Sequence, residues 1–299
     1  MKPLLNVKEY VAAEKEKVKE KVEQYKQLRN HSPHFVIVQF GDLEESNRYI
    51  KGKIKDCEEV GIYPKLIKVT DKEIDLNKVL DMIHESGISV EGLIIQEPIP
   101  DHVWIGPKIK YWNSIKCLKY IMGEIEAYQL KPVIDVDGFI DTSIIPCTAR
   151  GVLDYLSASG YDDMSGLNVT IINRSHLVGK PLILPLIQRN ATITIAHSCS
   201  NSCKLQRILE ESDIVITAVG KPIIGDDIAV YQYHKDFICP DSDHEKLFID
   251  VGIRVDENGK LQGDIQKGLF DYMHQTPVPG GVGLLTRLAA LKNLVDNLK

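Results

Sequence analysis

The sequence predicts an α/β protein with two domains and parallel sheets crossed over by helices. The chain has 299 residues, about twice the ~150 residues of an average domain. Short β-branched runs alternate with longer stretches of helical periodicity along most of the chain, which is typical of βαβ units. Apolar residues make up 43% and charged residues 26%, a composition that is ordinary for a globular protein and excludes a disordered one.

The first half opens with an expected helix over 6–29, because valines recur there at helical spacing among Lys and Glu, and Asn6 can cap its first turn. The apolar run 35–38 predicts a buried strand. A helix is expected over 46–60, and Gly61 ends it. The other elements expected in this half are a strand over 64–69, a helix over 75–86 and a strand over 90–95, followed by an irregular segment over 101–134 with one helix near 115–127.

The alternation resumes after Pro146 and continues to the end of the chain. We expect a crossover rhythm again, and hence a second parallel sheet. The helices predicted are 148–158, 179–189, 203–211 and 286–298, and the strands are 169–172, 192–195, 214–218 and 247–251.

Charge and cysteine usage exclude several classes of protein. The formal net charge of −6 argues against a nucleic-acid-binding protein, which needs a basic face. The chain has no signal-peptide pattern and no apolar run of ~18 residues, so we expect a cytoplasmic protein that does not bind membranes. The six cysteines are scattered, which indicates free thiols. His197, Cys199 and Cys203 lie close together but lack the spacing of a zinc site, and no metal is expected.

Two candidate sites lie in the first half. A helix over 46–55 places Tyr49 and Lys53 one turn apart on the same face, where a ring and an ammonium can meet a flat ligand. Gln96 ends a predicted parallel strand, the edge at which open α/β sheets bind ligands. Each also fits a plainer role, a solvated basic helix face or a strand exit closed by prolines.

Two further segments have loop character. Asp135 and Asp137 stand two apart before Gly138, a spacing that suits a turn, a metal or a hydrogen-bonded ligand. The Pro/Gly run 276–283 is too short for a linker and too apolar for a disordered tail. It indicates a shaped loop whose backbone can approach a ligand closely.

The turn at 172–181 follows an apolar strand and opens a helix, where the pyrophosphate of a dinucleotide is bound in Rossmann folds. Only Gly179 of the usual glycines is present, so the motif alone is weak. Arg174 can grip a phosphate with two N–H groups. His197 and Ser198 end the next strand, with no acid there for a free ribose 2′-hydroxyl, which favours NADP over NAD.

Together these segments resemble the methylenetetrahydrofolate dehydrogenase/cyclohydrolase family. The resemblance covers nearly the whole chain in the family's order. The matching motifs are Ser-Asn-x-Tyr-Ile-x-x-Lys-x-Lys at 46–55, Val-Asp-Gly at 136–138, Pro-Cys-Thr at 146–148, Arg-Ser-x-x-Val-Gly-x-Pro at 174–181, Asn-Ala-Thr at 190–192, His-Ser at 197–198, Ala-Val-Gly-Lys-Pro at 218–222, Asp-Val-Gly-Ile at 250–253, Gly-Asp at 263–264 and Thr-Pro-Val-Pro-Gly-Gly-Val-Gly at 276–283.

The resemblance implies oxidation of 5,10-methylenetetrahydrofolate by NADP, with NAD possible, and hydrolysis of the methenyl product to 10-formyltetrahydrofolate. It implies catalytic roles for Lys53, Tyr49, Gln96 and Asp137. The substrate-binding residues would be Tyr49, Ser46, Asp137, Pro277, Gly280 and Gly281. The cofactor-binding residues would be Asn173, Arg174, Ser175, Val178, Gly179, His197, Ser198, Ala218, Val219, Gly220, Gly252 and Ile253.

The resemblance also implies an architecture and an assembly. Residues 1–145 with 284–299 would form the folate-binding catalytic domain, and 146–283 a Rossmann-like dinucleotide-binding domain, with the active site in a cleft between them and a homodimer as the assembly.

Some residues depart from the family pattern. Glu97 stands in place of Leu, Ala149 and Leu284 in place of Pro, and Asn173 in place of Gly. Two alternatives therefore stay open: an NAD-dependent dehydrogenase with weak or absent cyclohydrolase activity, and a non-catalytic folate-binding module.

Overall fold

The computed structural model describes residues 4–70, 76–87, 90–96, 144–226, 232–234, 246–269 and 275–298. The chain forms two compact units. The N-terminal unit comprises Ala13–Cys147 and Ala290–Lys299, and the C-terminal unit comprises Met1–Ala12 and Thr148–Ala289. The domain boundaries expected at 145/146 and 283/284 stay a prediction. The helix expected near 115–127 lies outside the described residues.

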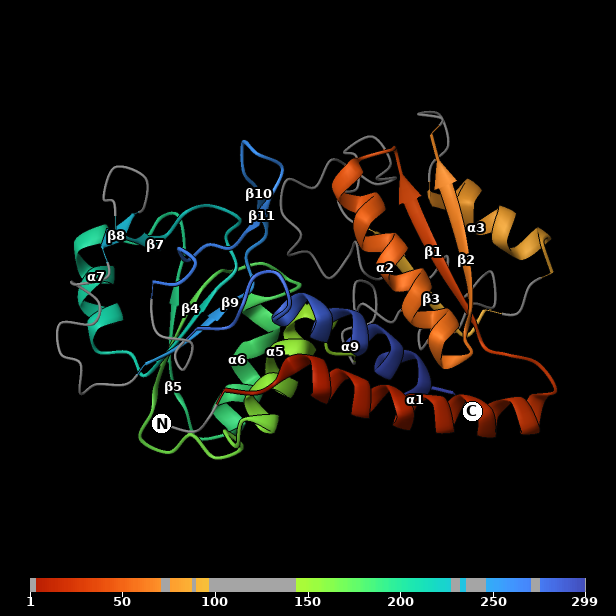
Figure 1. Ribbon diagram of the computed structural model, residues 1–299, viewed down its shortest axis with the longest axis horizontal. Helices are drawn as coiled ribbons and strands as arrows, with labels where there is room; N and C mark the ends of the chain where they lie inside the picture. Colours follow the sequence, from red (N-terminus) through yellow and green to blue (C-terminus); the bar gives the residue numbers. More distant parts are fainter. Residues whose placement is uncertain are drawn as a thin grey trace. The chain divides into compact units, whose positions relative to one another are not determined.

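The N-terminal unit contains a three-stranded parallel sheet in the order β2-β1-β3. Helix α2 runs beside β1 and β2 (Figure 1). The prediction of a parallel sheet in this half is confirmed. Its elements are α1 (Val7–Arg29) from Ala13 onward, β1 (His34–Phe40), α2 (Glu44–Val60), β2 (Tyr63–Val69), α3 (Leu76–Glu85) and β3 (Gly92–Gln96).

The ends of the first two helices follow the capping residues in the sequence. The Asn6 side chain accepts a hydrogen bond from the Glu9 N–H at 3.4 Å, as an N-cap does. Gly61 adopts a left-handed φ of 82° after α2, and the following N–H, of Ile62, bonds back to the Cys57 carbonyl at 2.9 Å. Glycine takes this conformation without a Cβ clash, so α2 ends where the sequence predicts.

The C-terminal unit contains a four-stranded parallel sheet in the order β5-β4-β6-β9. In Figure 1, α5 and α6 lie together on the side of this sheet away from α7. Its elements are α5 (Cys147–Ala158), β4 (Asn168–Ile172), α6 (Gly179–Gln188), β5 (Thr192–Ala196), α7 (Ser202–Glu210), β6 (Ile214–Thr217), β9 (Leu247–Asp250) and the part of α9 (Val282–Asp296) up to Ala289. Helix α9 begins before its predicted start.

Two small strand pairs were not predicted from the sequence. They are β7 (Ile224–Gly225) with β8 (Tyr233–His234), which is parallel, and β10 (Arg254–Val255) with β11 (Leu261–Gln262), which is antiparallel. Each strand has two residues, too few to show alternation in the sequence.

The sheet of the C-terminal unit is covered on both faces, as a parallel sheet requires. On one face, Leu205 and Leu209 of α7 join a buried cluster with Val215 and Phe248 of the sheet. The residues that alternate with these, such as Ile216 and Ile249, are also fully buried. The core thus holds the carboxyl ends of the strands, and the loops that leave them, in fixed positions.

Candidate functional site

A lysine and a glutamine meet at the carboxyl edge of the sheet in the N-terminal unit. Lys53 lies on α2 and Gln96 is the last residue of β3. The Lys53 Nζ donates to the Gln96 Oε1 at 3.0 Å, although the two residues are 43 apart in sequence. Only 7% of Lys53 is exposed. Among the described residues, this nearly buried ammonium is oriented by a neutral amide and has no ion-pair partner.

Tyr49 and Ser46 lie on the same helix as Lys53. Tyr49 stands one turn before the lysine and is partly exposed, while Ser46 is buried in the first turn. The helical spacing predicted for Tyr49 and Lys53 is therefore confirmed. Asp137, also expected at this site, lies outside the described residues.

Gln39 is a polar residue beside this pair that sequence reasoning missed. It pairs with Gln96 in the register of β1 and β3 and is 1% exposed. Its Nε2 donates to Asn47 Oδ1 at 2.8 Å, whereas its Oε1 is buried and accepts no hydrogen bond from the described residues. A glutamine inside the apolar run of β1 was the available signal, since buried amides need partners.

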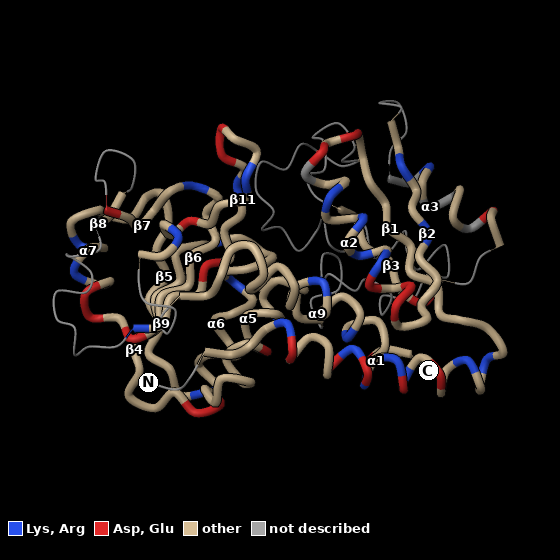
Figure 2. The backbone as a smooth tube through the Cα atoms, viewed as in Figure 1, with Lys and Arg blue, Asp and Glu red and all other residues tan. Residues whose placement is uncertain are grey.

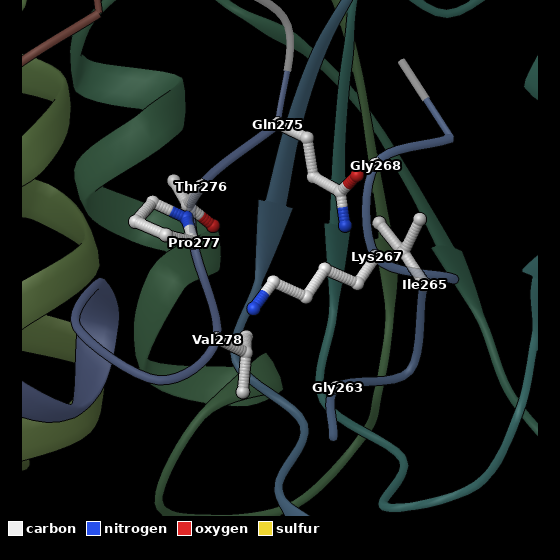
Figure 3. Close-up of a pocket in the computed structure, with 8 residues that line it drawn as sticks. All are labelled: Gly263, Ile265, Lys267, Gly268, Gln275, Thr276, Pro277 and Val278. Carbon is white, nitrogen blue, oxygen red and sulfur yellow. The ribbon is translucent and has the colours of Figure 1, made fainter. Parts of the chain in front are cut away.

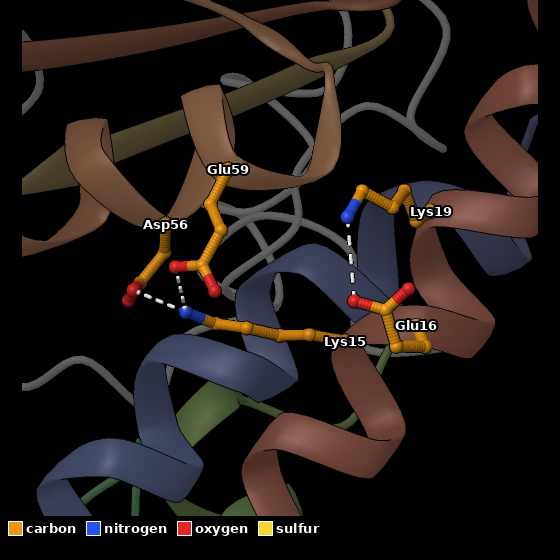
Figure 4. A network of polar contacts seen from close by, with 5 residues as sticks. All are labelled: Lys15, Glu16, Lys19, Asp56 and Glu59. Carbon is orange, nitrogen blue, oxygen red and sulfur yellow. Dashed lines mark hydrogen bonds and ion pairs between the residues drawn. The ribbon is translucent and has the colours of Figure 1, made fainter.

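Helix α2 is tied to α1 by an ion pair that is largely buried. Lys15 Nζ lies 2.7 Å from Asp56 Oδ1 and 2.7 Å from Glu59 Oε2 (Figure 4). Burial works against the charge of Lys15, but its hydrogen bonds to Asp56 and Glu59 outweigh burial and raise its pKa. Elsewhere along α1, charges of both signs alternate (Figure 2). Lys15 thus fixes one side of the helix that presents Lys53.

The turn between β4 and α6, expected to hold a pyrophosphate, is closed by Asn173. The Asn173 Oδ1 accepts from the N–H of Ser175 at 2.7 Å and of Gly179 at 3.0 Å. A Cβ on Gly179 would lie 2.3 Å from the Asn173 carbonyl oxygen, so only glycine fits there. The Val178 N–H donates to Ser175 Oγ at 3.1 Å. The sequence predicts that N–H groups of this turn bind a phosphate, but these N–H groups are already paired within the turn.

Arg174 brings a positive charge to the end of the neighbouring strand. Its Nη2 lies 3.9 Å from the Sγ of Cys199, three residues after β5. His197 and Ser198 occupy the same strand end, where the His197 N–H donates to Ser200 Oγ at 3.0 Å. No carboxylate occurs between Thr192 and Cys203. The strand end therefore offers donors to an anion rather than an acceptor to a hydroxyl.

Two buried carboxylates shape the loops that follow β6 and β9. The Asp264 carboxylate accepts from the N–H groups of Val219 at 2.6 Å, Gly220 at 2.8 Å and Lys221 at 3.1 Å. Asp250 in turn accepts from the N–H groups of Asp264 and Ile265 at 3.0 and 2.9 Å. Ala218, Val219 and Gly220, expected at the cofactor, thus owe their loop conformation to a residue of another loop.

Glycines make room for both carboxylates. A Cβ on Gly252 would lie 1.9 Å from Asp264 Oδ1, and a Cβ on Gly263 would lie 2.0 Å from Asp250 Oδ2. This explains the Gly-Asp pair at 263–264 and the glycine before Ile253, whose structural role the sequence alone does not indicate. Burial raises the pKa of Asp250 to about 7 and also raises that of Asp264.

A cavity of about 160 Å³ lies beside these loops in the C-terminal unit. Lys267 extends across it toward Val278 (Figure 3). Pro277, expected at the substrate, lines this cavity, while Gly280 and Gly281 follow in the turn before α9. Its lining consists of Gly263, Ile265, Lys267 and Gly268 on one side and of Gln275, Thr276, Pro277 and Val278 on the other.

The structure therefore gathers the expected residues into two sets, one in each unit. Lys53, Tyr49, Ser46 and Gln96 belong to the N-terminal unit. The residues from 173 to 281 belong to the C-terminal unit. None of the helices in the described ranges is both long and apolar enough to span a membrane.

Comparison with known proteins identifies the family of both halves. Residues 5–117 match the family model "Tetrahydrofolate dehydrogenase/cyclohydrolase, catalytic domain", and residues 146–299 match "Tetrahydrofolate dehydrogenase/cyclohydrolase, NAD(P)-binding domain". The bifunctional protein FolD of Oceanobacillus iheyensis is 33% identical over 316 residues, which cover 100% of this chain and 98% of that protein. The FolD of Brevibacillus brevis is 33% identical over 89% of this chain and 87% of its own.

Solved structures agree with these matches. The bifunctional FolD methylenetetrahydrofolate dehydrogenase/cyclohydrolase of Campylobacter jejuni superposes with a TM-score of 0.78 at 27% identity, over 99% of this chain and 98% of that one. A 5,10-methylenetetrahydrofolate dehydrogenase of the silkworm, Bombyx mori, gives a TM-score of 0.77 at 26% identity, over 100% and 98% of the two chains. The chain therefore belongs to the tetrahydrofolate dehydrogenase/cyclohydrolase family and carries both its catalytic and its NAD(P)-binding domain.

Proposed function

We propose that this chain oxidises 5,10-methylenetetrahydrofolate with NADP and hydrolyses the methenyl product to 10-formyltetrahydrofolate. The observation that carries the proposal is that Lys53 is nearly buried and donates a hydrogen bond to Gln96. The two steps make different demands. Hydride transfer to the nicotinamide depends on orientation, whereas water attack and ring opening need a group that moves protons.

Lys53 is the group suited to the proton transfers. It stands at the sheet edge where parallel α/β sheets bind ligands, and Gln96 orients its ammonium without changing charge. Tyr49, one turn away on α2, is placed to stack on the flat pterin, and Ser46 to contact the substrate. We assign the pterin contact to Asp137 as well, and contacts near the reacting carbon to Pro277, Gly280 and Gly281.

Replacing Lys53 tests the catalytic assignment. Lys53→Met removes the proton-transfer group but keeps much of the apolar stem, so hydrolysis of methenyltetrahydrofolate should fall by roughly 10²- to 10⁴-fold while the circular dichroism spectrum is kept. Lys51→Met, an exposed lysine on the same helix, is the control and should retain activity. Near-normal hydrolysis by Lys53→Met would refute the role of this lysine.

A folate-binding role for Asp137 is tested separately. Asp137→Ala removes a hydrogen-bonding carboxylate and should raise the KM for methylenetetrahydrofolate by roughly 10-fold or more, since hydrogen bonds to charged groups contribute about 1.5–3 kcal/mol. The KM for the dinucleotide should stay unchanged. An unaltered folate KM would count against the pterin contact.

The choice of NADP rests on the C-terminal unit. Arg174 lies beside Cys199 at the end of β5, the position from which the 2′ position of the adenosine ribose is read in this fold. We assign adenosine-side contacts to Arg174, Ser175, His197 and Ser198, and contacts along the rest of the dinucleotide to Asn173, Val178, Gly179, Ala218, Val219, Gly220, Gly252 and Ile253. Because the N–H groups of Val178 and Gly179 are paired within the turn, we expect side-chain donors to contribute to the phosphate binding.

Turnover with the two dinucleotides tests this choice. The wild-type protein should prefer NADP, and Arg174→Ala should raise the KM for NADP by roughly 10- to 100-fold while leaving that for NAD almost unchanged. Arg207→Ala, on the exposed face of α7, is the matched control. Preference of the wild-type protein for NAD would favour the alternative that Asn173 suggests, an NAD-dependent dehydrogenase with little cyclohydrolase activity.

We also infer a cytoplasmic homodimer. The inference rests on membership of the family, whose relatives include the FolD proteins of Oceanobacillus iheyensis and Brevibacillus brevis. Sedimentation equilibrium of the purified chain decides between a mass of 33.6 kDa and twice that value.

A further inference from the structure

We propose that His31, His34 and Glu91 form a binding site for a divalent transition metal ion, with zinc as the best fit. The cluster lies in the N-terminal unit, at the end of the sheet opposite to Lys53 and Gln96. Glu91 precedes β3 and Gln96 ends it, so the length of a five-residue strand, roughly 16 Å, separates the two places. The proposed reaction makes no use of this cluster.

The three side chains come from separate segments that the sheet brings together. His31 lies between α1 and β1, His34 begins β1, and Glu91 lies directly before β3. One ligand atom from each side chain lies within 4.8 Å of the other two. His34 Nδ1 is 3.6 Å from Glu91 Oε2. Donors bound to one tetrahedral zinc at about 2.1 Å are roughly 3.4 Å apart, so small side-chain rotations would close the site.

The histidines have the hydrogen bonding that a metal ligand needs. His31 Nδ1 lies 2.9 Å from the carbonyl oxygen of Ser32 and must donate to it, which leaves the lone pair of a neutral ring on Nε2. Histidines that bind metals commonly donate their other ring N–H to a carbonyl in this way. His34 Nδ1 is buried and has no hydrogen-bond partner among the described residues. A bound ion would satisfy this nitrogen.

The carboxylate is fixed by its own hydrogen bonds. Glu91 Oε1 accepts from the Tyr25 hydroxyl at 3.0 Å, and Oε2 accepts from the His34 N–H at 2.6 Å. The Glu91 side chain is 11% exposed. A carboxylate offers about four lone-pair sites, so Glu91 can bind a metal in addition to accepting these two hydrogen bonds.

The ligand types select the ion. Two imidazoles and a carboxylate suit zinc, cobalt or nickel, whereas magnesium and calcium prefer oxygen ligands alone. Three protein ligands leave a fourth position for water. The expected consequence is structural: the ion joins the loop after α1 to the first residues of β1 and the residue before β3.

The test is a calorimetric titration: the full-length chain is first stripped of metal with a chelator, and its zinc affinity is then measured by adding zinc in a calorimeter. We expect one zinc bound per chain and a higher melting temperature with zinc, by mass action. His31→Ala and His34→Ala should each weaken zinc binding by more than about 100-fold. Tyr25→Phe removes only a hydrogen bond to a ligand and should weaken it by roughly 10- to 100-fold. His31 lies outside the helices and strands, so His31→Ala decides the matter if His34→Ala does not fold.

Among the described residues, the exposed thiols of Cys199 and Cys203 are a competing place for zinc. The double variant Cys199→Ser/Cys203→Ser should bind zinc as the wild type does. With cobalt in place of zinc, the wild type should show visible d–d bands without thiolate-to-metal charge-transfer absorption. Absence of zinc binding, unchanged affinity in His31→Ala, or loss of binding in the double cysteine variant would overturn the proposal. Turnover assays do not enter this test, so its failure leaves the proposed reaction untouched.

Discussion

At the scale of single residues, we expect a substitution of Asp264 to affect both the stability of the C-terminal unit and its binding of the dinucleotide. Its two oxygens accept three N–H groups from Val219 to Lys221, and an asparagine keeps only one acceptor oxygen. Asp264→Asn should therefore lower the free energy of unfolding by about 1–3 kcal/mol. It should also raise the dinucleotide KM, because the loop at 218–220 loses its support.

Urea unfolding and initial rates measure these two effects. Asp256→Asn is the matched control, since this carboxylate also accepts backbone N–H groups but in an exposed turn. It should change stability less and leave the dinucleotide KM alone. Equal effects of the two substitutions would show that Asp264 has no special part in shaping the loop.

The sequence predicts those parts of the site that depend on local spacing, but not those that depend on contacts between distant residues. Tyr49 and Lys53 share a helix face at a spacing of four, so local sequence was enough to place them together. Gln39 and Asp264 act through contacts with residues far away in the chain, which only the folded sheet creates. Lys246 shows the same limit: it is 1% exposed, and its Nζ donates to the carbonyl oxygens of Leu209 and Ser212 at the end of α7.

At the scale of elements, the ion pair between α1 and α2 helps to hold the helix that carries Lys53. Lys15→Met leaves the buried carboxylate of Asp56 without its ammonium partner, although Asp56 keeps other interactions. We expect the free energy of unfolding to fall by about 1–3 kcal/mol. Cyclohydrolase activity should fall with it, because α2 carries the proton-transfer lysine.

Lys19→Met is the internal comparison for this prediction. Lys19 pairs with Glu16 on the same helix at 3.3 Å, with both side chains at least half exposed (Figure 4). Such exposed pairs contribute little, so stability should change by less than about 0.5 kcal/mol. Thermal unfolding of both variants at neutral pH measures the two losses of stability. A larger loss of stability in Lys19→Met than in Lys15→Met would contradict the prediction.

The elements themselves were predictable wherever capping and periodicity agree. Asn6 and Gly61 mark helix ends in the sequence, and the structure uses both. The start of α9 at Val282, four residues before the predicted start, shows what pattern reading misses. Gly283 lies in its first turn, and a glycine there suggests a loop from sequence alone.

At the scale of the whole molecule, the buried pair Asp250 and Asp264 should make stability depend on pH in an unusual direction. Burial raises the pKa of Asp250 to about 7 from an ordinary value of 3.8, so between these values the folded chain binds more protons than the unfolded one. Stability from this group is therefore present in full below about pH 4 and falls as pH rises toward 7. The raised pKa of Asp264 acts in the same direction.

Other carboxylates act against this trend only in acid. Hydrogen bonds to lysines lower the pKa values of Asp42 and Glu59, so their contributions are present above about pH 4 and lost as pH falls further. Burial lowers the pKa of His176, so the contribution of this group to stability rises as the pH rises toward 6.5. The substitution His176→Asn removes this contribution. His176→Asn should therefore show a urea midpoint that falls between about pH 5 and 7, as its free energy of unfolding decreases by at most about 1.4 kcal/mol per pH unit for each titrating group. A midpoint that is flat or rises between about pH 5 and 7 would show that the backbone N–H groups around Asp250 stabilise its charged form more than burial opposes it.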